Sequence, residues 1–117
     1  MARRPSQVDL EVFEQQAEIC KAFASPLRLR LLDLLESGER PCSELQASLG
    51  ITKTNLSQHL SVLRDAGLVR ARKNGREILC SITLPEVTTV CSCMHEVLRH
   101  RIEVAKRLGA RLTKKSV

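Results

Sequence analysis

The segment from Ile51 to Glu77 restricts the fold of this chain more than any other part of the sequence. Between Thr52 and Gly67 the apolar residues recur at helical spacing, which predicts an amphipathic helix with one side suited to a core (Leu56, Leu60 and Leu63). Gly67 is suited to end the helix, and the pair Asn74-Gly75 predicts a tight two-residue hairpin directly after it. A helix joined in this way to a basic hairpin predicts a winged helix-turn-helix, a mainly α fold with a small β-hairpin wing.

The other side of this helix and the tip of the hairpin carry side chains suited to DNA. Short or flexible hydrogen-bonding side chains in the N-terminal half of the helix can read base edges, while basic side chains of the wing can contact phosphates. The residues expected to contact DNA are Lys53, Thr54, Ser57, Gln58, Arg72, Lys73 and Arg76. A formal net charge of +6 favours a polyanionic partner. The sequence therefore predicts a protein that binds double-stranded DNA.

Composition and motifs argue against several other classes of protein. Single-strand and RNA binders usually stack bases on aromatic side chains, whereas this chain has two Phe and no Trp or Tyr, so we expect no RNA partner. No segment has the length of a membrane span and no signal peptide opens the sequence, so we expect a cytoplasmic protein with no membrane partner. No phosphate-binding glycine loop, nucleophile elbow or carboxylate pair is evident, so we do not expect an enzyme.

The remainder of the chain predicts further helices within a single domain of residues 1–117. We expect a first helix over about 6–24, a second from Pro26 to Gly38, a short third helix ending at Gly50 and a last helix over about 84–112. Capping signals mark the helix starts, namely Ser6 with Asp9, Ser25 before Pro26, Ser43 with Gln46, Thr52, and Thr83 with Glu86.

Alternation along the hairpin sets its expected strand pairing. With Asn74-Gly75 as the loop, Arg72 should face Glu77 across the two strands, which is a favourable charge pair. One face of the hairpin should then point towards the core, carrying Val69, Ala71, Ile78, Cys80 and Ile82.

The first and last helices carry more apolar surface than a domain of this size can bury. The stripe on the first helix consists of Leu10, Phe13, Ala17, Cys20 and Ala24. The stripe on the last helix consists of Val87, Val90, Cys91, Met94, Val97, Leu98, Ile102, Ala105 and Leu108. We therefore expect a homodimer packed through helices 6–24 and 84–112, whose two-fold symmetry would present two reading helices to a palindromic site.

The same segments carry a resemblance to a known family. The matching residues are Phe23–Arg30 with Leu31-Leu32, Cys42–Leu45, Thr54–Leu60, Leu63-Arg64, Ala66–Val69 and Gly75-Arg76. On these residues the chain resembles the ArsR/SmtB family of bacterial metal-, metalloid- and thiol-sensing repressors. The resemblance implies a dimeric winged helix that represses its own operon and releases the operator DNA when an inducer binds.

Five cysteines offer candidate inducer sites. Cys91 and Cys93 stand near the start of the last helix, and Cys20 lies on the stripe of the first helix, which should approach the last helix across the dimer. Thiolates from all three residues would suit As(III) or another soft, thiophilic ion. Cys91 also fits the apolar stripe, where it would be a small core residue and nothing more.

Cys42 and Cys80 form a second candidate pair. In a winged helix the short strand before the third helix, here Arg40 to Cys42, pairs with the second hairpin strand, which contains Cys80. Opposed residues on antiparallel strands have Cα atoms about 4.5–5.5 Å apart, a separation that a disulfide can bridge. The two residues would then form a redox pair, or else they are two buried small side chains.

These patterns favour one function and leave two alternatives open. The leading prediction is a homodimeric repressor that binds operator DNA and is released by a thiophilic metalloid or metal. One alternative is a repressor with a redox or persulfide thiol switch. The other is a DNA-binding module that has no inducer.

Overall fold

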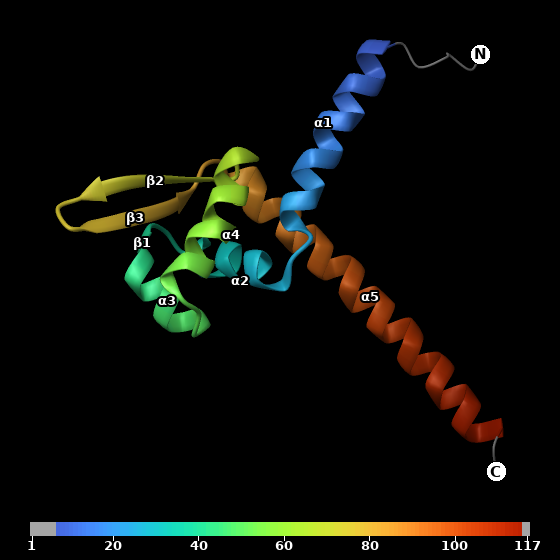
Figure 1. The fold of residues 1–117 in the computed structure, drawn as a ribbon. Coiled ribbons are helices and arrows are strands. Elements are labelled where there is room, and N and C mark those ends of the chain that lie inside the picture. Colours follow the sequence, from blue (N-terminus) through green and yellow to red (C-terminus); the bar gives the residue numbers. More distant parts are fainter. Residues whose placement is uncertain (1–6, 116–117) are drawn as a thin grey trace.

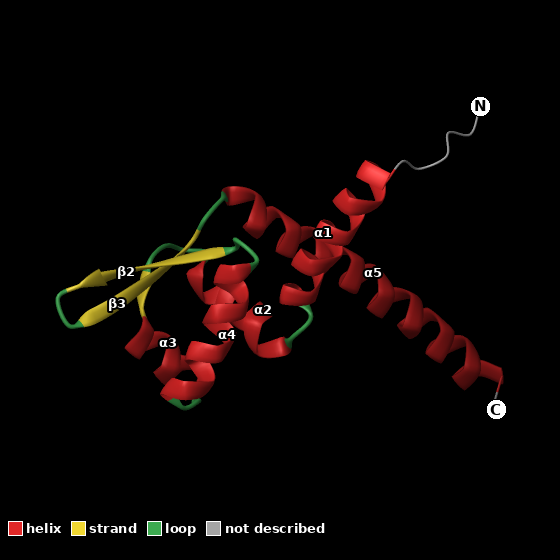
Figure 2. Ribbon diagram, turned by 45° about the horizontal axis from the view of Figure 1, so that its top comes forward, coloured by secondary structure: helices red, strands yellow, loops and turns green. Residues whose placement is uncertain are grey.

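The computed structural model describes residues 7–115 and shows a small winged domain from which two helices project (Figure 1). The helices are α1 (Gln7–Phe23), α2 (Pro26–Leu35), α3 (Cys42–Leu49), α4 (Lys53–Asp65) and α5 (Pro85–Lys115), and the strands are β1 (Arg40–Pro41), β2 (Val69–Asn74) and β3 (Glu77–Ile82). The strands form one antiparallel sheet in the order β1-β3-β2. The predicted winged helix-turn-helix is confirmed, and the hairpin of β2 and β3 is its wing (Figure 2).

Two of the predicted helix starts are confirmed by their capping hydrogen bonds. The Ser25 hydroxyl accepts a hydrogen bond from the backbone N–H of Arg28 at 3.3 Å, and α2 begins at the residue after the serine. The Thr52 hydroxyl accepts a hydrogen bond from the backbone N–H of Asn55 at 3.1 Å, and α4 likewise begins one residue later. The expected cap at Ser6 lies outside the described residues.

The predicted capping box of Ser43 and Gln46 is wrong. A cap at Ser43 would start the helix at Glu44, but α3 begins two residues earlier, at Cys42, and its N-cap is Pro41, which makes no side-chain capping bond. The sheet is the reason, because Arg40 and Pro41 pair with β3 and the chain turns into the helix directly after them. The strand expected from Arg40 to Cys42 is therefore one residue shorter.

The predicted capping box of Thr83 and Glu86 is also wrong. The Thr83 hydroxyl instead points at the backbone oxygens of Gly67, at 2.7 Å, and Leu68, at 3.2 Å, and can donate to either. This contact ties the end of β3 to the turn after α4. α5 begins at Pro85, as expected for a first-turn proline, and runs slightly past its expected end.

The hairpin is predicted correctly, but its register is not. The loop is Gly75-Arg76 with Asn74 opposite Glu77, so Arg72 faces Leu79 and not Glu77. Gly75 has a φ of 65°, a left-handed conformation that glycine adopts without steric cost, and it takes the first of the two loop positions. A type I′ loop at Asn74-Gly75 would need a positive φ at Asn74 as well, whereas a Gly75-Arg76 loop needs it only at the glycine, and every positive φ among the described residues belongs to a glycine.

Only the base of the wing belongs to the core. Val69 and Cys80 are buried and Ile82 is half-buried, as the alternation predicts. Ala71 and Ile78 were expected on the inside, but both are exposed. The hairpin extends beyond the helices towards its tip, and the side chains of its outer half are exposed (Figure 1).

Leucines from α2, α3 and α4 form most of the core. On α4, Leu56, Leu60 and Leu63 are 2%, 6% and 0% exposed, so the predicted core-facing side of this helix is confirmed. Buried leucines also hold α2 against the core. This helix ends at Leu35, before the expected end at Gly38. Burial of a leucine side chain stabilises a fold by about 1.5–3 kcal/mol, so these contacts hold α4 with its polar side outward.

Arg28 joins α1, α2 and α4. Its Nε donates to the backbone oxygen of Ala22 at 2.7 Å, and its Nη2 donates to the backbone oxygen of Lys21 at 3.0 Å. The Ala22 carbonyl belongs to the last turn of α1, where carbonyl groups lack partners within the helix, while the Lys21 carbonyl also accepts the backbone N–H of Ala24. The Nη1 atom lies 3.4 Å from Nδ1 of His59, so this half-buried histidine packs against Arg28.

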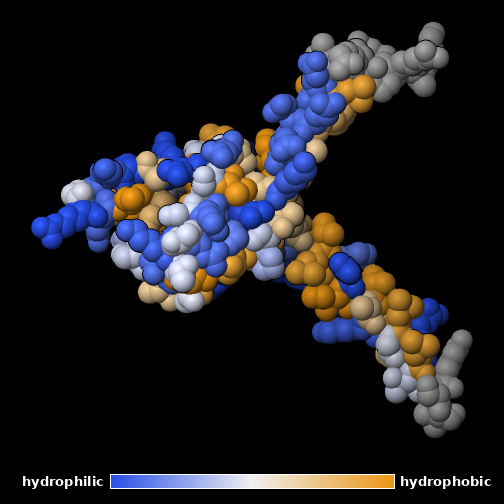
Figure 3. Space-filling view, viewed as in Figure 1, coloured by the Kyte–Doolittle hydropathy of each residue, from blue (hydrophilic) through white to orange (hydrophobic). Residues whose placement is uncertain are grey.

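α1 and α5 project from the domain and leave large apolar side chains uncovered, as Figure 3 shows along both helices. In α1, Leu10 and Phe13 are exposed. The exposed large apolar residues of α5, named the α5 stripe below, are Val90, Met94, Val97, Leu98, Ile102, Val104, Leu108 and Leu112. Within residues 7–115 no helix combines the length and the apolar character that crossing a membrane requires.

Candidate DNA-binding interface

The N-terminal half of α4 presents a polar surface to solvent. The four side chains predicted there to contact DNA are all exposed, namely Lys53, Thr54, Ser57 and Gln58. The Thr52 cap and the buried leucines on the opposite side of α4 fix how this surface is turned. A rigid helix that projects short hydrogen-bonding side chains has the shape and chemistry that the major groove of DNA accepts.

The start of α4 and the tip of the wing border a common groove. Its volume is about 300 Å³, and its lining includes Lys53 and Ser57 from α4, Arg76 from the loop of the wing, and Ser43 and Gln46 from α3. The two elements that the sequence predicts to contact DNA are thus adjacent in space. A duplex that enters along α4 therefore meets the cationic loop of the wing with its phosphates.

The basic side chains of the wing are not equivalent. Arg72 makes a two-pronged ion pair with Glu39, with Nη2 to Oε1 at 2.7 Å and Nε to Oε2 at 2.9 Å. This hydrogen-bonded guanidinium lowers the pKa of the Glu39 carboxyl, and the carboxylate raises the pKa of Arg72. Among the described residues, neither Lys73 nor Arg76 makes an ion pair. Of the basic side chains predicted to contact phosphates from the wing, Arg72 is thus the one that a carboxylate engages in the described part of the chain.

One basic residue of the wing was missed from the sequence. Arg70 is exposed in β2, and its Nε donates to the Ser81 hydroxyl at 3.4 Å. It lies two residues before Arg72 on the same strand, so both side chains belong to one face of the wing. Strand alternation around Arg72 was the signal that could have identified it.

The three cysteines predicted to bind an inducer do not meet within one chain. Cys20 is exposed on α1, Cys93 is exposed on α5, and Cys91 is half-buried. Across the described residues, no group of three or more His, Cys, Asp or Glu side chains is placed to hold a metal ion. Burial raises the pKa of the Cys91 thiol, and the carboxylates of Glu36 and Asp33 raise it further.

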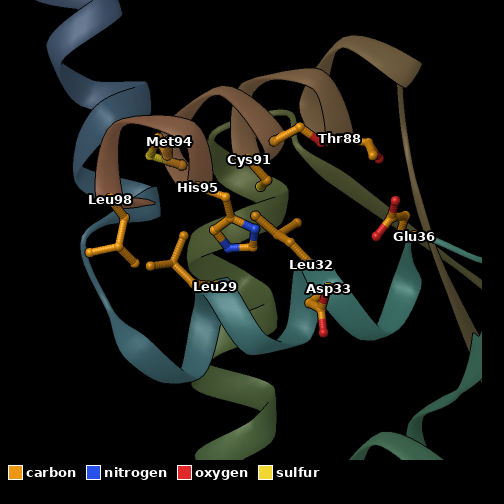
Figure 4. A pocket seen from close by; sticks show the side chains of 10 residues that line it. Leu29, Leu32, Asp33, Glu36, Thr88, Cys91, Met94, His95 and Leu98 are labelled. Carbon is orange, nitrogen blue, oxygen red and sulfur yellow. The ribbon is translucent and has the colours of Figure 1, made fainter. Parts of the chain in front are cut away.

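Cys91 lines a cavity between α2 and α5 that sequence reasoning did not anticipate (Figure 4). The cavity has a volume of about 350 Å³, with Leu29, Asp33 and Glu36 on the α2 side and Cys91 and His95 on the α5 side. Figure 4 shows the His95 ring pointing into it. The signal in the sequence was the four-residue spacing of Cys91 and His95, which puts both on one side of a helix.

Cys42 and Cys80 are brought together, with their Sγ atoms 3.3 Å apart. The strand argument for this pair is correct in its topology but not in its register, because Arg40 is the residue opposite Cys80. Cys42 follows at the first position of α3 and reaches back to β3 from there. Cys80 is 1% exposed, and mainly burial, with a contribution from Cys42, raises its pKa to about 12.

The chain is similar in sequence and structure to bacterial transcriptional regulators. A family model described as a helix-turn-helix domain matches residues 23–72. The HTH-type transcriptional regulator Rv0081 of Mycobacterium tuberculosis is 39% identical over 88 residues, which cover 74% of this chain and 77% of the relative. The probable mercury resistance operon repressor of Streptomyces lividans is 39% identical over 71 residues, which cover 61% of this chain and 57% of the relative. A solved structure, the homodimeric winged helix-turn-helix DNA-binding domain of Mb0332 from Mycobacterium bovis, a possible ArsR-family regulator, aligns with a TM-score of 0.77 and 31% identity over 88% of this chain and 94% of that chain.

Proposed function

Because the chain belongs to the ArsR/SmtB family of winged helix-turn-helix transcriptional regulators, we propose that it is a homodimer that represses its own operon by binding double-stranded operator DNA. Members of this family are DNA-binding regulators and not enzymes. The proposal includes an inducer, a thiophilic metalloid or metal such as As(III), that binds cysteine thiolates and releases the DNA. All of these functions are assigned to a single domain of residues 1–117.

The observation that carries the DNA-binding role is the groove shared by α4 and the wing. Lys53, Ser57 and Arg76 line it together, and Gln58 and Lys73 are exposed on the same two elements. Hydrogen-bonding side chains on α4 supply the readout of base edges, and the cations of the wing supply phosphate contacts. Neither group alone would distinguish a DNA reader from an ordinary polar surface.

The uncovered side chains of α1 and α5 support a homodimer. The α5 stripe and the exposed Leu10 and Phe13 of α1 form more apolar surface than a monomer of this size normally leaves in water. A second copy of the chain offers the same helices, and a two-fold axis lets identical surfaces cover each other. The similar domain of Mb0332 is homodimeric, which favours the same arrangement here.

The distribution of the thiols supports an inducer site at this dimer interface. Cys20 and Cys93 are exposed on the two helices that a dimer would cover, and Cys91 is half-buried two residues before Cys93 on α5. Soft thiolate ligands select soft ions, and the mercury resistance operon repressor among the relatives is named for a metal of that kind. Coordination releases DNA only if the ion binds the DNA-free arrangement of the dimer more tightly than the DNA-bound one.

We expect Gln58→Ala to weaken operator binding by about 1–3 kcal/mol and to relax specificity at one base pair, because the amide can form two hydrogen bonds with a base edge. The matched variant is Lys73→Ala on the wing. It should weaken binding to all sequences alike and lower the slope of log affinity against log salt by about one, since it removes a phosphate contact. Fluorescence anisotropy on a set of operator variants at several salt concentrations measures both effects. A uniform loss for Gln58→Ala would contradict its role in reading bases.

We expect As(III) to lower operator affinity by about 5- to 150-fold, the usual range of coupling between two sites. A triple variant with Ser at Cys20, Cys91 and Cys93 should bind DNA normally but should not respond, while Cys42→Ser should still respond. Gel-shift assays with As(III), Cd(II) and Zn(II) added separately provide the measurement. A response that survives in the triple variant would rule out this set of thiols. A wild-type protein that ignores every ion would instead favour a DNA-binding module without an inducer.

A further inference from the structure

The contact between Cys42 and Cys80 lies inside the reading head, the part of the chain formed by α3, α4 and the wing. We propose that these two thiols are an oxidisable pair that a hydroperoxide closes to a disulfide, and that the new bond weakens the grip of the reading head on DNA. Formation of the disulfide is argued from the geometry of the two thiols. The loss of DNA binding on oxidation rests on the proposed function, because it requires a chain that binds DNA when reduced.

Two separate elements fix the distance between the thiols. Cys42 is the first residue of α3, directly after the two residues of β1 that pair with β3. Cys80 lies inside β3, opposite Arg40 on one side and Ala71 of β2 on the other. Strand pairing on both sides of β3 therefore holds the Sγ atoms at 3.3 Å. Closure to a disulfide bond of about 2.05 Å requires a movement of only roughly 1 Å.

The two thiols differ in their access to a reagent. Cys42 is half-buried and forms part of the lining of the groove between α4 and the wing, so a small peroxide reaches it from that groove. Cys80 is buried, with a hollow of about 70 Å³ beside both thiols. Because burial favours the neutral thiol at Cys80, Cys42 is the residue that meets the oxidant first.

Oxidation of the two thiols to a disulfide takes two steps. The Cys42 thiol loses its proton, its thiolate attacks one oxygen of the hydroperoxide, and the O–O bond breaks to give a sulfenic acid at Cys42. The departing oxygen takes up the proton that the thiol released and leaves as water or an alcohol. The Cys80 sulfur attacks the Cys42 sulfur, the S–S bond forms, and the S–O bond breaks. The departing hydroxide takes the proton of the Cys80 thiol and leaves as water. In total the two thiols lose two electrons and two protons, and one hydroperoxide is reduced.

The position of the new bond explains its effect on DNA binding. It joins the start of α3 to the strand at the base of the wing, and both elements border the groove lined by Lys53, Ser57 and Arg76. α3 also packs on α4, so displacement of Cys42 towards Cys80 shifts α4 relative to the wing. Base readout depends on hydrogen bonds with narrow limits of distance and angle, so a shift of this size costs affinity.

The test uses the full chain with Ser at Cys20, Cys91 and Cys93, in which only the proposed pair remains. After mild treatment with hydrogen peroxide, peptide mapping without reductant should find Cys42 linked to Cys80 in most molecules. Operator affinity should fall at least about fivefold and should recover with a thiol reductant. Two further variants, with either Cys42→Ser or Cys80→Ala added, should form no such link and should keep their DNA affinity under peroxide. Two variants are used because Cys80 is buried and its replacement can impair folding.

Each outcome decides one part of the inference. The absence of a Cys42–Cys80 link would overturn the proposal completely. A link formed with no change in DNA affinity would overturn the proposed coupling. If the reduced chain binds no operator at all, the proposed function fails. Peptide mapping still decides whether Cys42 and Cys80 form a disulfide. A loss of affinity that also occurs in the Cys42→Ser variant would assign the effect to another residue and would contradict the proposal.

Discussion

Replacing Leu63 with alanine is expected to lower the free energy of unfolding by about 2–5 kcal/mol, the range seen when a buried leucine is truncated. Leu63 is 0% exposed and belongs to the cluster that α4 shares with α2 and the base of the wing. Truncation removes apolar contacts and leaves a cavity that rigid neighbours fill only in part. Because the whole domain has few buried side chains, a loss of this size is a large fraction of its stability.

Val62→Ala is the matched control, since the residue precedes Leu63 on the same helix but is 40% exposed. Its expected effect is below about 1 kcal/mol. Chemical denaturation monitored by circular dichroism measures both variants, and the protein concentration must be held constant because the proposed dimerisation would add to apparent stability. Equal losses for the two variants would mean that α4 does not dock on the core through Leu63.

Leu108→Asp is expected to convert the proposed homodimer to a monomer. Leu108 is more than half exposed in the single chain and lies on the α5 stripe, far along the helix from the reading head. In a two-fold dimer the substitution places two unpaired carboxylates in an apolar interface, each at a cost of several kcal/mol. The dissociation constant of the dimer should therefore rise by roughly a hundredfold or more, because each 1.4 kcal/mol is a factor of ten.

Lys106→Gln serves as the control for Leu108→Asp. It changes the charge by the same amount, but its side chain lies about 200° around the helix from that of Leu108. Analytical ultracentrifugation should find Leu108→Asp monomeric and Lys106→Gln dimeric. The monomeric variant should also lose most of its affinity for a palindromic operator, since each half-site would then be bound independently. A dimeric Leu108→Asp protein would exclude this part of α5 from the interface.

Sequence reasoning was most successful where the signal is local. The Ser25 and Thr52 caps act within three residues, and the leucine spacing of α4 is a property of a single helix. It was wrong where a distant partner decides the local structure. Ser43 loses its capping role because β3 holds the residues before it, and Thr83 loses its own because backbone oxygens of the turn after α4 attract its hydroxyl.

The same distinction applies to the candidate site. The polar side of α4 could be read directly from the order of residues. The pairing of Arg72 with Glu39 could not, because these residues are far apart in the chain and meet only through the fold of the sheet. The contact of Cys42 with Cys80 was anticipated from strand topology, but the residue opposite Cys80 was not. The cavity lined by Cys91 and His95 depends on how α5 crosses α2, which no local pattern encodes.

Because α5 is long, the angle at which its first turn leaves the domain determines where the far end of the helix lies. The helix has 31 residues, which corresponds to about 46 Å, and its buried Val87 fixes it to the domain near β3. A tilt of about 10° at this joint would displace the far end by roughly 8 Å, so α5 acts as a lever. In a dimer held together along α5, the spacing of the two α4 helices is therefore governed by one angle close to Cys91 and Cys93. Under the proposed function, a small change of this angle by the inducer would misplace the two α4 helices relative to grooves that lie a full turn of DNA apart.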